Sequence, residues 1–152
     1  MSGISIKTVM VLAVMAVYLP AICYAADLPV TSPFGWRIHP ITGEYSFHTG
    51  VDLGYDYGTE IFALCSGIAL QAGDYGDGYG NQVLLYHRDS DCYTRYAHLS
   101  AVYLSPGQLV VQGQMIGTVG ATGNATGPHL HLEYIVPSTN GYEYRDPLLL
   151  WQ

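Results

Sequence analysis

Charged side chains are scarce in this chain of 152 residues, and basic ones are the scarcest. Asp, Glu, Lys and Arg together make up 11% of the sequence, with 12 acidic residues against 5 basic ones and Lys7 as the single lysine. The net charge of −7 leaves no basic surface for nucleic acid or an anionic membrane, so we expect neither as a partner. The apolar share of 49% excludes a disordered acidic tail, because such a chain can bury a core.

Long apolar runs are absent apart from Val9–Leu19, which follows Lys7. At about 1.5 Å per residue this run is too short to span a bilayer. A basic residue, a short apolar run and then small residues predict a secretory signal peptide over 1–25, which leaves 26–152 as the mature domain. An uncleaved anchor and a lipid-modified Cys23 are the alternatives. Export implies a periplasmic or extracellular location, with no stable membrane insertion after cleavage.

Cysteine is also rare, with three residues in the chain. Removal of the signal peptide leaves Cys65 and Cys92. An even pair in an exported protein is a disulfide candidate. Two buried free thiols are the alternative, because the sequence does not show whether the two Cα atoms approach each other.

No segment after residue 26 has the pattern of a long helix, because glycine and proline interrupt the chain too often. Short β-rich segments lie between these breaks, with no internal repeat and no linker. We therefore expect an all-β fold, a single compact domain of antiparallel sheets. The predicted strands are Ile61–Leu64, Gly67–Ala72, Gln82–Tyr86, Thr94–His98, Leu109–Val111, Met115–Val119 and His129–Val136.

Histidine and carboxylate residues gather in two short motifs. The first is His48-Thr49-Gly50-Val51-Asp52. In an extended segment residues 48, 50 and 52 point to the same side, so His48 and Asp52 can aim at one point while Gly50 leaves room between them. An imidazole nitrogen and a carboxylate oxygen suit Zn²⁺, although this spacing is also common by chance.

The second motif alternates His129, His131 and Glu133 with Leu130 and Leu132. Period two places both imidazoles on one face of a strand and the leucines in the core. Two charged imidazoles side by side would repel, so a metal or a neutral catalytic pair explains them better than an exposed polar face. For Glu133, an exposed carboxylate is the simpler interpretation, and orientation of a neighbouring imidazole is the alternative.

A further histidine, His98, follows a predicted strand in Tyr96-Ala97-His98-Leu99. The chain has no HExxH helix, so the arrangement with a glutamate base is absent. A catalytic zinc takes three protein ligands and an open position. Histidines that do not bind the metal would then have to perform the acid–base chemistry.

With these motifs in order, the chain resembles the lysostaphin-type zinc metallopeptidases, the LytM domain family of peptidoglycan endopeptidases. The resemblance covers about residues 31–150, and its separate motifs follow the order and roughly the spacing of the family. The matching segments are Ser32-Pro33-Phe34-Gly35-Trp36-Arg37, His39-Pro40-Ile41-Thr42-Gly43, His48-Thr49-Gly50-Val51-Asp52-Leu53, Gly78-Tyr79-Gly80-Asn81, Tyr96-Ala97-His98-Leu99 and Gly127-Pro128-His129-Leu130-His131.

The resemblance implies one zinc ion per chain, bound by His48, Asp52 and His131 beneath long loops that form a groove. It implies that His98 and His129 are the catalytic histidines, one taking a proton from water and the other stabilising the oxyanion or protonating the leaving amine. Which histidine does which stays open. Copper or manganese is an alternative metal for such ligands.

Three further residues are candidates for substrate binding. The resemblance places His39 near the rim of the groove, although it also fits a turn before Pro40. Tyr79, in the glycine-rich loop, is a candidate for the groove lining. Asn81 contacts substrate or holds a turn, and both interpretations stay open.

The resemblance implies a peptidoglycan substrate, either glycine bridges or direct D-alanyl–diamino acid cross-links. We favour the direct cross-links, because a small exported domain with a candidate disulfide and no wall-targeting module suits a periplasm. Such an enzyme would make local openings for an envelope-spanning machine. A non-enzymatic regulator of another wall hydrolase is the main alternative, and a zinc-dependent module that binds wall peptides without cutting them is a third.

Overall fold

Antiparallel pairing accounts for the architecture of the computed structural model, which describes residues 28–39 and 42–151. The predicted signal peptide, 1–25, lies outside the described residues. All seven predicted strands are present, and the all-β prediction is confirmed. The elements are β1 (Val30–Ser32), β2 (Gly35–Ile38), β3 (Tyr45–His48), β4 (Val51–Leu53), β5 (Glu60–Phe62), β6 (Gly67–Asp74), β7 (Asn81–His87), β8 (Cys92–Val102), β9 (Leu109–Val110), β10 (Met115–Val119), β11 (Leu130–Ser138), β12 (Gly141–Arg145) and the 3₁₀ helix η2 (Pro147–Trp151).

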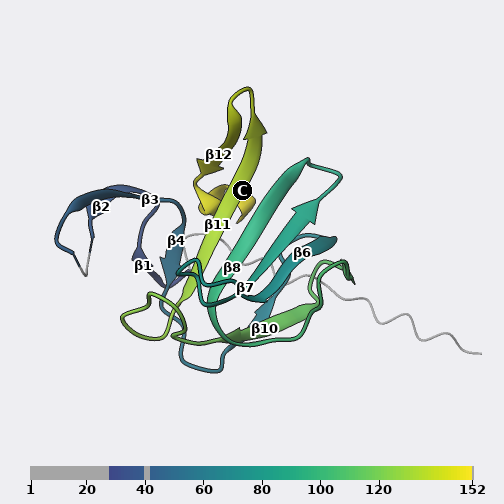
Figure 1. The fold of residues 1–152 in the computed structure, drawn as a ribbon, viewed down its shortest axis with the longest axis horizontal. Coiled ribbons are helices and arrows are strands. Elements are labelled where there is room, and N and C mark those ends of the chain that lie inside the picture. Colours follow the sequence, from purple (N-terminus) through teal and green to yellow (C-terminus); the bar gives the residue numbers. More distant parts are fainter. Residues whose placement is uncertain (1–27, 40–41, 152) are drawn as a thin grey trace, which may run out of the picture.

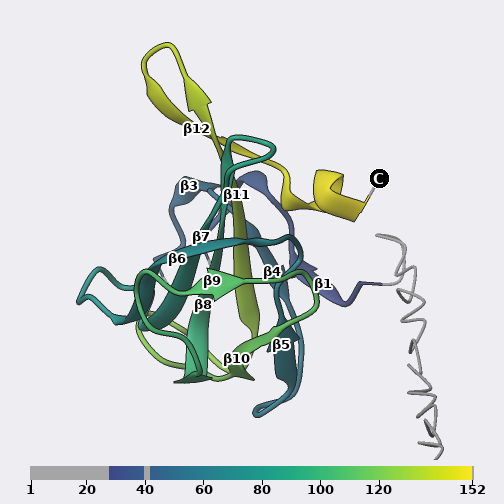
Figure 2. The same ribbon diagram turned by 90° about the vertical axis from the view of Figure 1, so that its right-hand side faces the viewer.

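Ten strands form one large sheet with the order β1-β4-β11-β8-β7-β6-β9. Beyond this path β10 pairs with both β8 and β5, and β12 extends from β11 as a hairpin (Figure 1). Because β10 pairs with the far part of β8 and carries β5 on its other edge, the sheet curls (Figure 2). This curl encloses the core.

The core is built from strand residues at alternate positions. In β11, Leu130 is 4% exposed and Leu132 is 0% exposed, and they oppose Leu53 and Val51 of β4 across the ladder. Since side chains alternate along a strand, the residues between these leucines are turned to the other face of the sheet. The apolar alternation thereby decides which face of β11 carries His131.

A separate two-stranded sheet, β2 and β3, arches away from the large sheet (Figure 1). Its outer face is apolar and exposed, with Trp36 stacked on Tyr45 at 5.2 Å between ring centroids and Phe47 set edge-on to Trp36. Cross-strand aromatic pairs of this kind stabilise a hairpin that has little else to pack on. The inner face carries Arg37 and His48.

The strands that were not predicted are β1 to β4 and β12. Each has three to five residues, and β2 and β3 expose their apolar side chains, so the usual rule of apolar inside and polar outside does not reveal them. Cys65 and Cys92 are free thiols in the structure, as in the second alternative for this pair, but only Cys92 is buried and Cys65 is half-buried. Among the described residues, no helix is long and apolar enough to cross a bilayer.

We expect Gly50→Ala to destabilise the fold, because β4 lies tightly against β11 at this point. A Cβ on residue 50 would come 2.9 Å from Cε1 of His131 and would also meet the Leu132 carbonyl. Relief of this overlap requires a backbone shift, which costs about 1–3 kcal/mol. Urea unfolding measures the loss.

Gly127→Ala is the matched control, since a Cβ there meets nothing within 4 Å. Equal unfolding midpoints for wild type and Gly50→Ala would contradict this account of the contact.

Candidate functional site

The centre of the site is a carboxylate and an imidazole that face each other across two strands. Asp52 of β4 and His131 of β11 are direct partners in the antiparallel ladder. Oδ1 of Asp52 lies 2.8 Å from Nδ1 of His131. Directly opposed residues of an antiparallel pair place their side chains on the same face, so the strand register alone brings these two groups together.

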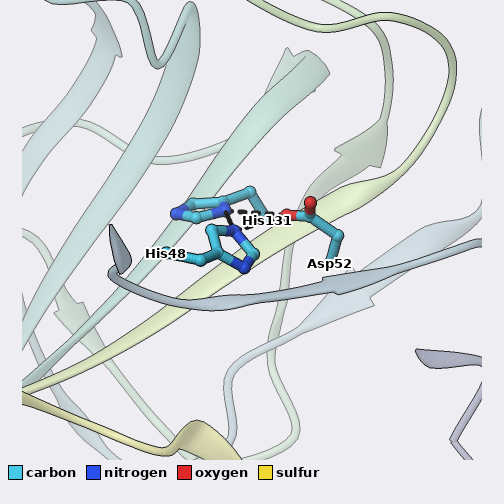
Figure 3. Close-up of side chains that lie close together, drawn as sticks. All are labelled: His48, Asp52 and His131. Atoms are coloured by element: carbon cyan, nitrogen blue, oxygen red, sulfur yellow. Dashed lines mark hydrogen bonds and ion pairs between the residues drawn. The ribbon is translucent and has the colours of Figure 1, made fainter. Parts of the chain in front are cut away.

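His48 completes the group from a different sheet. It is the last residue of β3, and the chain bends at Thr49 and Gly50 before β4 begins, so the predicted single extended segment is wrong. Nε2 of His48 nevertheless lies 3.2 Å from Oδ1 of Asp52 and 3.1 Å from Nδ1 of His131. Figure 3 shows the three side chains pointing toward one another.

The donor set of His48, Asp52 and His131 fits a zinc ion. Two ligands bound about 2.0–2.1 Å from a tetrahedral metal lie about 3.3 Å apart, close to the separations within this group. Nδ1 of His48 donates to the Pro33 carbonyl at 2.8 Å, because a carbonyl can only accept. Its Nε2 therefore presents a lone pair to the same point as the Asp52 carboxylate, and three electron-rich atoms that converge need a cation between them.

The electrostatics of the group also favour a cation. Burial by itself raises the pKa of Asp52, but hydrogen bonds with His131 and His48 outweigh it and hold that pKa well below the usual range. Burial lowers the pKa of His131, and its bonds to Asp52 and Glu133 outweigh burial and raise it. The carboxylates thus hold positive charge at His131, as a proton or as a metal ion.

Glu133 lies behind His131 and is 0% exposed, so the simpler interpretation of an exposed carboxylate is wrong. Its Oε1 lies 3.3 Å from Nε2 of His131 and accepts hydrogen bonds from Thr49 at 2.5 Å and Tyr79 at 2.7 Å. Arg95 lies 3.5 Å from its Oε2. A carboxylate that accepts from Nε2 leaves Nδ1 of His131 free to bind a metal, which is the common arrangement behind metal-bound histidines.

A β-bulge aims His98 at the group. Between β7 and β8, Asn81 pairs with Leu99 and Val83 pairs with Tyr96, so β8 carries one extra residue. His98 has a φ of 61°, a rare value for a residue with a side chain, and bulges of this kind redirect a side chain beside active sites. Its Nδ1 donates to the Thr122 carbonyl at 2.8 Å, and burial lowers its pKa to about 4. His98 is therefore neutral at pH 7 with a lone pair on Nε2.

His129 stands just before β11 and is held by an isolated bridge to Gly120. Its Nδ1 donates to the Gly127 carbonyl at 2.9 Å, and its Nε2 lies 3.7 Å from Oδ1 of Asp52. The rings of His98 and His129 are 4.8 Å apart between centroids. The structure thus brings all five predicted metal-binding and catalytic residues to one place.

Two adjoining cavities of about 250 and 420 Å³ form a groove over this place. His39 and Tyr79 line the smaller one, and His39 also holds its own turn, because Nδ1 accepts from the Thr42 amide at 3.3 Å. Asn81 lines neither cavity, and its backbone N–H donates to Oγ1 of Thr122 at 3.0 Å. The side chain that lines the groove from the neighbouring loop is that of another asparagine, Asn124.

Sequence reasoning assigned no role to Arg37 or Thr49, and both lie at the site. Arg37 lines both cavities and places Nη2 3.8 Å from Oδ2 of Asp52. Arg37 is the last residue of the motif Ser32-Pro33-Phe34-Gly35-Trp36-Arg37. It is one of only five basic residues in the sequence, and this rarity could have marked it as a candidate site residue. Thr49 bonds Glu133, and nothing in the sequence indicates that contact.

Comparison with known proteins agrees with this arrangement. Residues 46–146 match the model of Peptidase family M23. The chain belongs to this family.

The DD-carboxypeptidase/endopeptidase Mpg of Neisseria meningitidis is 45% identical over 104 residues, which cover 68% of this chain and 24% of that protein. The peptidoglycan DD-endopeptidase ShyC of Vibrio cholerae is 44% identical over 101 residues, or 66% of this chain and 23% of that protein. The chain thus spans about a quarter of the length of these two relatives.

Solved structures of M23 peptidases have the same fold. The catalytic domain of lysostaphin from Staphylococcus simulans matches with a TM-score of 0.73 and 32% identity, over 84% of this chain and 94% of that one. A zinc-containing peptidase from Vibrio cholerae matches with a TM-score of 0.65 and 36% identity, over 76% of this chain and 35% of that one. The match to lysostaphin extends over nearly all of its catalytic domain.

We expect Glu133→Gln to weaken zinc binding about 10- to 100-fold, because it removes the charge that orients and polarises His131. Competition with a chromophoric chelator measures the affinity. Glu143→Gln is the matched control, since Glu143 is exposed and pairs with Arg145 on the β12 hairpin. Unchanged affinity in Glu133→Gln would show that His131 does not depend on this carboxylate.

Proposed function

We propose that this M23 domain is a zinc-dependent endopeptidase that hydrolyses peptide cross-links of bacterial cell-wall peptidoglycan. The observation that carries the proposal is the convergence of five side chains under one groove. Three of them, His48, Asp52 and His131, are suited to hold one zinc ion. The other two, His98 and His129, line the same cavity with no role in that donor set.

Zinc held by His48, Asp52 and His131 would supply a Lewis acid that lowers the pKa of a water molecule. His98 is suited to accept the proton of that water, because it is neutral and its Nδ1 is occupied by the Thr122 carbonyl. His129 contributes the second imidazole. Because its Nδ1 donates to the Gly127 carbonyl, Nε2 is the nitrogen left for substrate, and it donates to the developing oxyanion or the leaving amine when it carries a proton. Glu133 holds the orientation of His131.

We propose direct D-alanyl–diamino acid links as the bonds that are cut. The Neisseria relative is a DD-carboxypeptidase/endopeptidase and the Vibrio relative ShyC is a peptidoglycan DD-endopeptidase, and they are 45% and 44% identical to this chain over 104 and 101 residues. Lysostaphin is 36% identical over 115 residues. A wall substrate places the enzyme outside the cytoplasm, which agrees with the predicted signal peptide and a periplasmic or extracellular location. That the enzyme makes local openings in the wall for an envelope-spanning machine stays a prediction.

Digestion of purified cross-linked peptidoglycan by residues 26–152 tests this proposal. We expect the zinc-loaded protein to convert cross-linked dimers into monomers and a chelator to abolish the conversion. Mass spectrometry of the released peptides identifies the bond. Intact dimers after incubation with a folded, zinc-loaded sample would contradict the proposal and favour the regulator or the binding module.

Two alanine variants separate metal binding from proton transfer. We expect His98→Ala to keep a full equivalent of zinc and to lose activity about 10²- to 10⁴-fold, because only the proton acceptor is removed. His131→Ala should lose both zinc and activity. Zinc content measured by mass spectrometry, beside the rate of dimer cleavage, distinguishes them. Zinc loss from His98→Ala would show that His98 is a ligand.

A further inference from the structure

Arg37 is the one arginine that lines the groove. The chain has four arginines, all within the described residues, and of these only Arg37 borders the two cavities. Arg95 lies over the ring of Tyr79, with its guanidinium carbon 4.1 Å from the ring centroid. Arg88 and Arg145 line neither cavity. An anionic group of a substrate that enters this groove therefore has Arg37 as its arginine partner.

The guanidinium of Arg37 is not fully used by contacts within the protein, so it has N–H groups that can bind a substrate anion. Its Nη2 lies 3.8 Å from Oδ2 of Asp52, which is longer than a hydrogen bond, and the paired groups do not form a bidentate contact. Among the described residues, its Nε is buried and has no hydrogen-bond partner. The side chain is 18% exposed and lines both cavities, so an anion in the groove can contact the guanidinium, although the buried Nε lies out of its reach.

Arg37 also stands at a defined distance from the metal-binding group. Oδ1 of Asp52 faces His48 and His131, while Oδ2 of the same carboxylate faces Arg37. The guanidinium thus lies beyond this carboxylate from the two imidazoles, with Nη2 3.8 Å from Oδ2. An anion on Arg37 and a carbonyl at the metal-binding group would lie in neighbouring parts of one substrate, since an extended residue spans about 3.3–3.6 Å.

We propose that Arg37 binds the free α-carboxylate of the substrate residue that follows the scissile bond. This inference rests on the proposed peptidase function and names the feature of the substrate that the site selects. In a peptide ending in D-Ala-D-Ala, the carbon attached to the scissile nitrogen carries the terminal carboxylate. In a direct cross-link, the D-centre of the diamino acid carries its free carboxylate on that same carbon.

A glycine bridge has no charge at this position, because the carbonyl that follows the scissile nitrogen belongs to the next amide. Arg37 therefore favours DD-substrates over glycine bridges. The charge of the whole molecule cannot supply this preference, since a net charge of −7 repels anionic peptides. The selection comes from one local cation.

Two peptides that differ at a single group test the proposal: diacetyl-L-Lys-D-Ala-D-Ala as the free acid and as the C-terminal amide. We measure kcat/KM of zinc-loaded wild type and Arg37→Gln for each. Wild type should prefer the acid about 10- to 100-fold, the value of a charge-assisted hydrogen bond. Arg37→Gln should lose most of this preference through a lower kcat/KM for the acid.

Arg145→Gln is the matched control, because Arg145 is exposed on the β12 hairpin and its removal changes the net charge equally. It should keep the wild-type preference for the acid. Zinc content of each variant is measured beside the rates. An equal fall for acid and amide, or loss of zinc from Arg37→Gln, would show that Arg37 acts only through Asp52, and would overturn the proposal.

If wild type cleaves neither peptide nor the cross-linked wall, the proposed function fails, and calorimetric titration of the zinc-loaded proteins with the same two peptides decides the role of Arg37 separately. Tighter binding of the acid by wild type, lost in Arg37→Gln, supports the carboxylate site. Equal affinities for acid and amide overturn it.

Discussion

The pairing of Asp52 with His131 across β4 and β11 is the interaction on which the site depends. The two side chains meet because their strands are in register, and the leucines on either side of His131 hold that register by their burial in the core. A shift of one residue would turn the imidazole into the core and a leucine into the groove. The same strand register thus determines both the packing of the core and the geometry of the site.

Backbone carbonyls orient the remaining imidazoles. His48, His98 and His129 each give Nδ1 to a carbonyl, from Pro33, Thr122 and Gly127 respectively. Since a carbonyl only accepts, Nδ1 of each ring carries a proton, which leaves Nε2 as the nitrogen that faces the site. His131 is the exception, with Nε2 on a carboxylate and Nδ1 toward the other donors. The fold therefore orients three imidazoles through backbone carbonyls and places the fourth, His131, between two carboxylates.

The large strands were predictable from apolar alternation, and the five central residues from the resemblance to the LytM domain family. Period two placed Leu130 and Leu132 inward and His131 on the opposite face, and the structure agrees. The β2–β3 hairpin was not predictable, because its apolar side chains face outward. The burial of Glu133 was missed for a related reason. The face of β11 that carries it is covered by Thr49, Tyr79 and Arg95, which come from distant parts of the chain.

The sequence by itself determined the fold class, the family and the chemical types at the centre, because alternation of apolar residues and short motifs are local properties of the chain. Tertiary structure alone decided which groups act together. The bulge that turns His98, the arch that brings His48 to Asp52, and the position of Arg37 beside the same carboxylate are contacts between distant segments. Such contacts depend on strand order and register, which no single segment encodes.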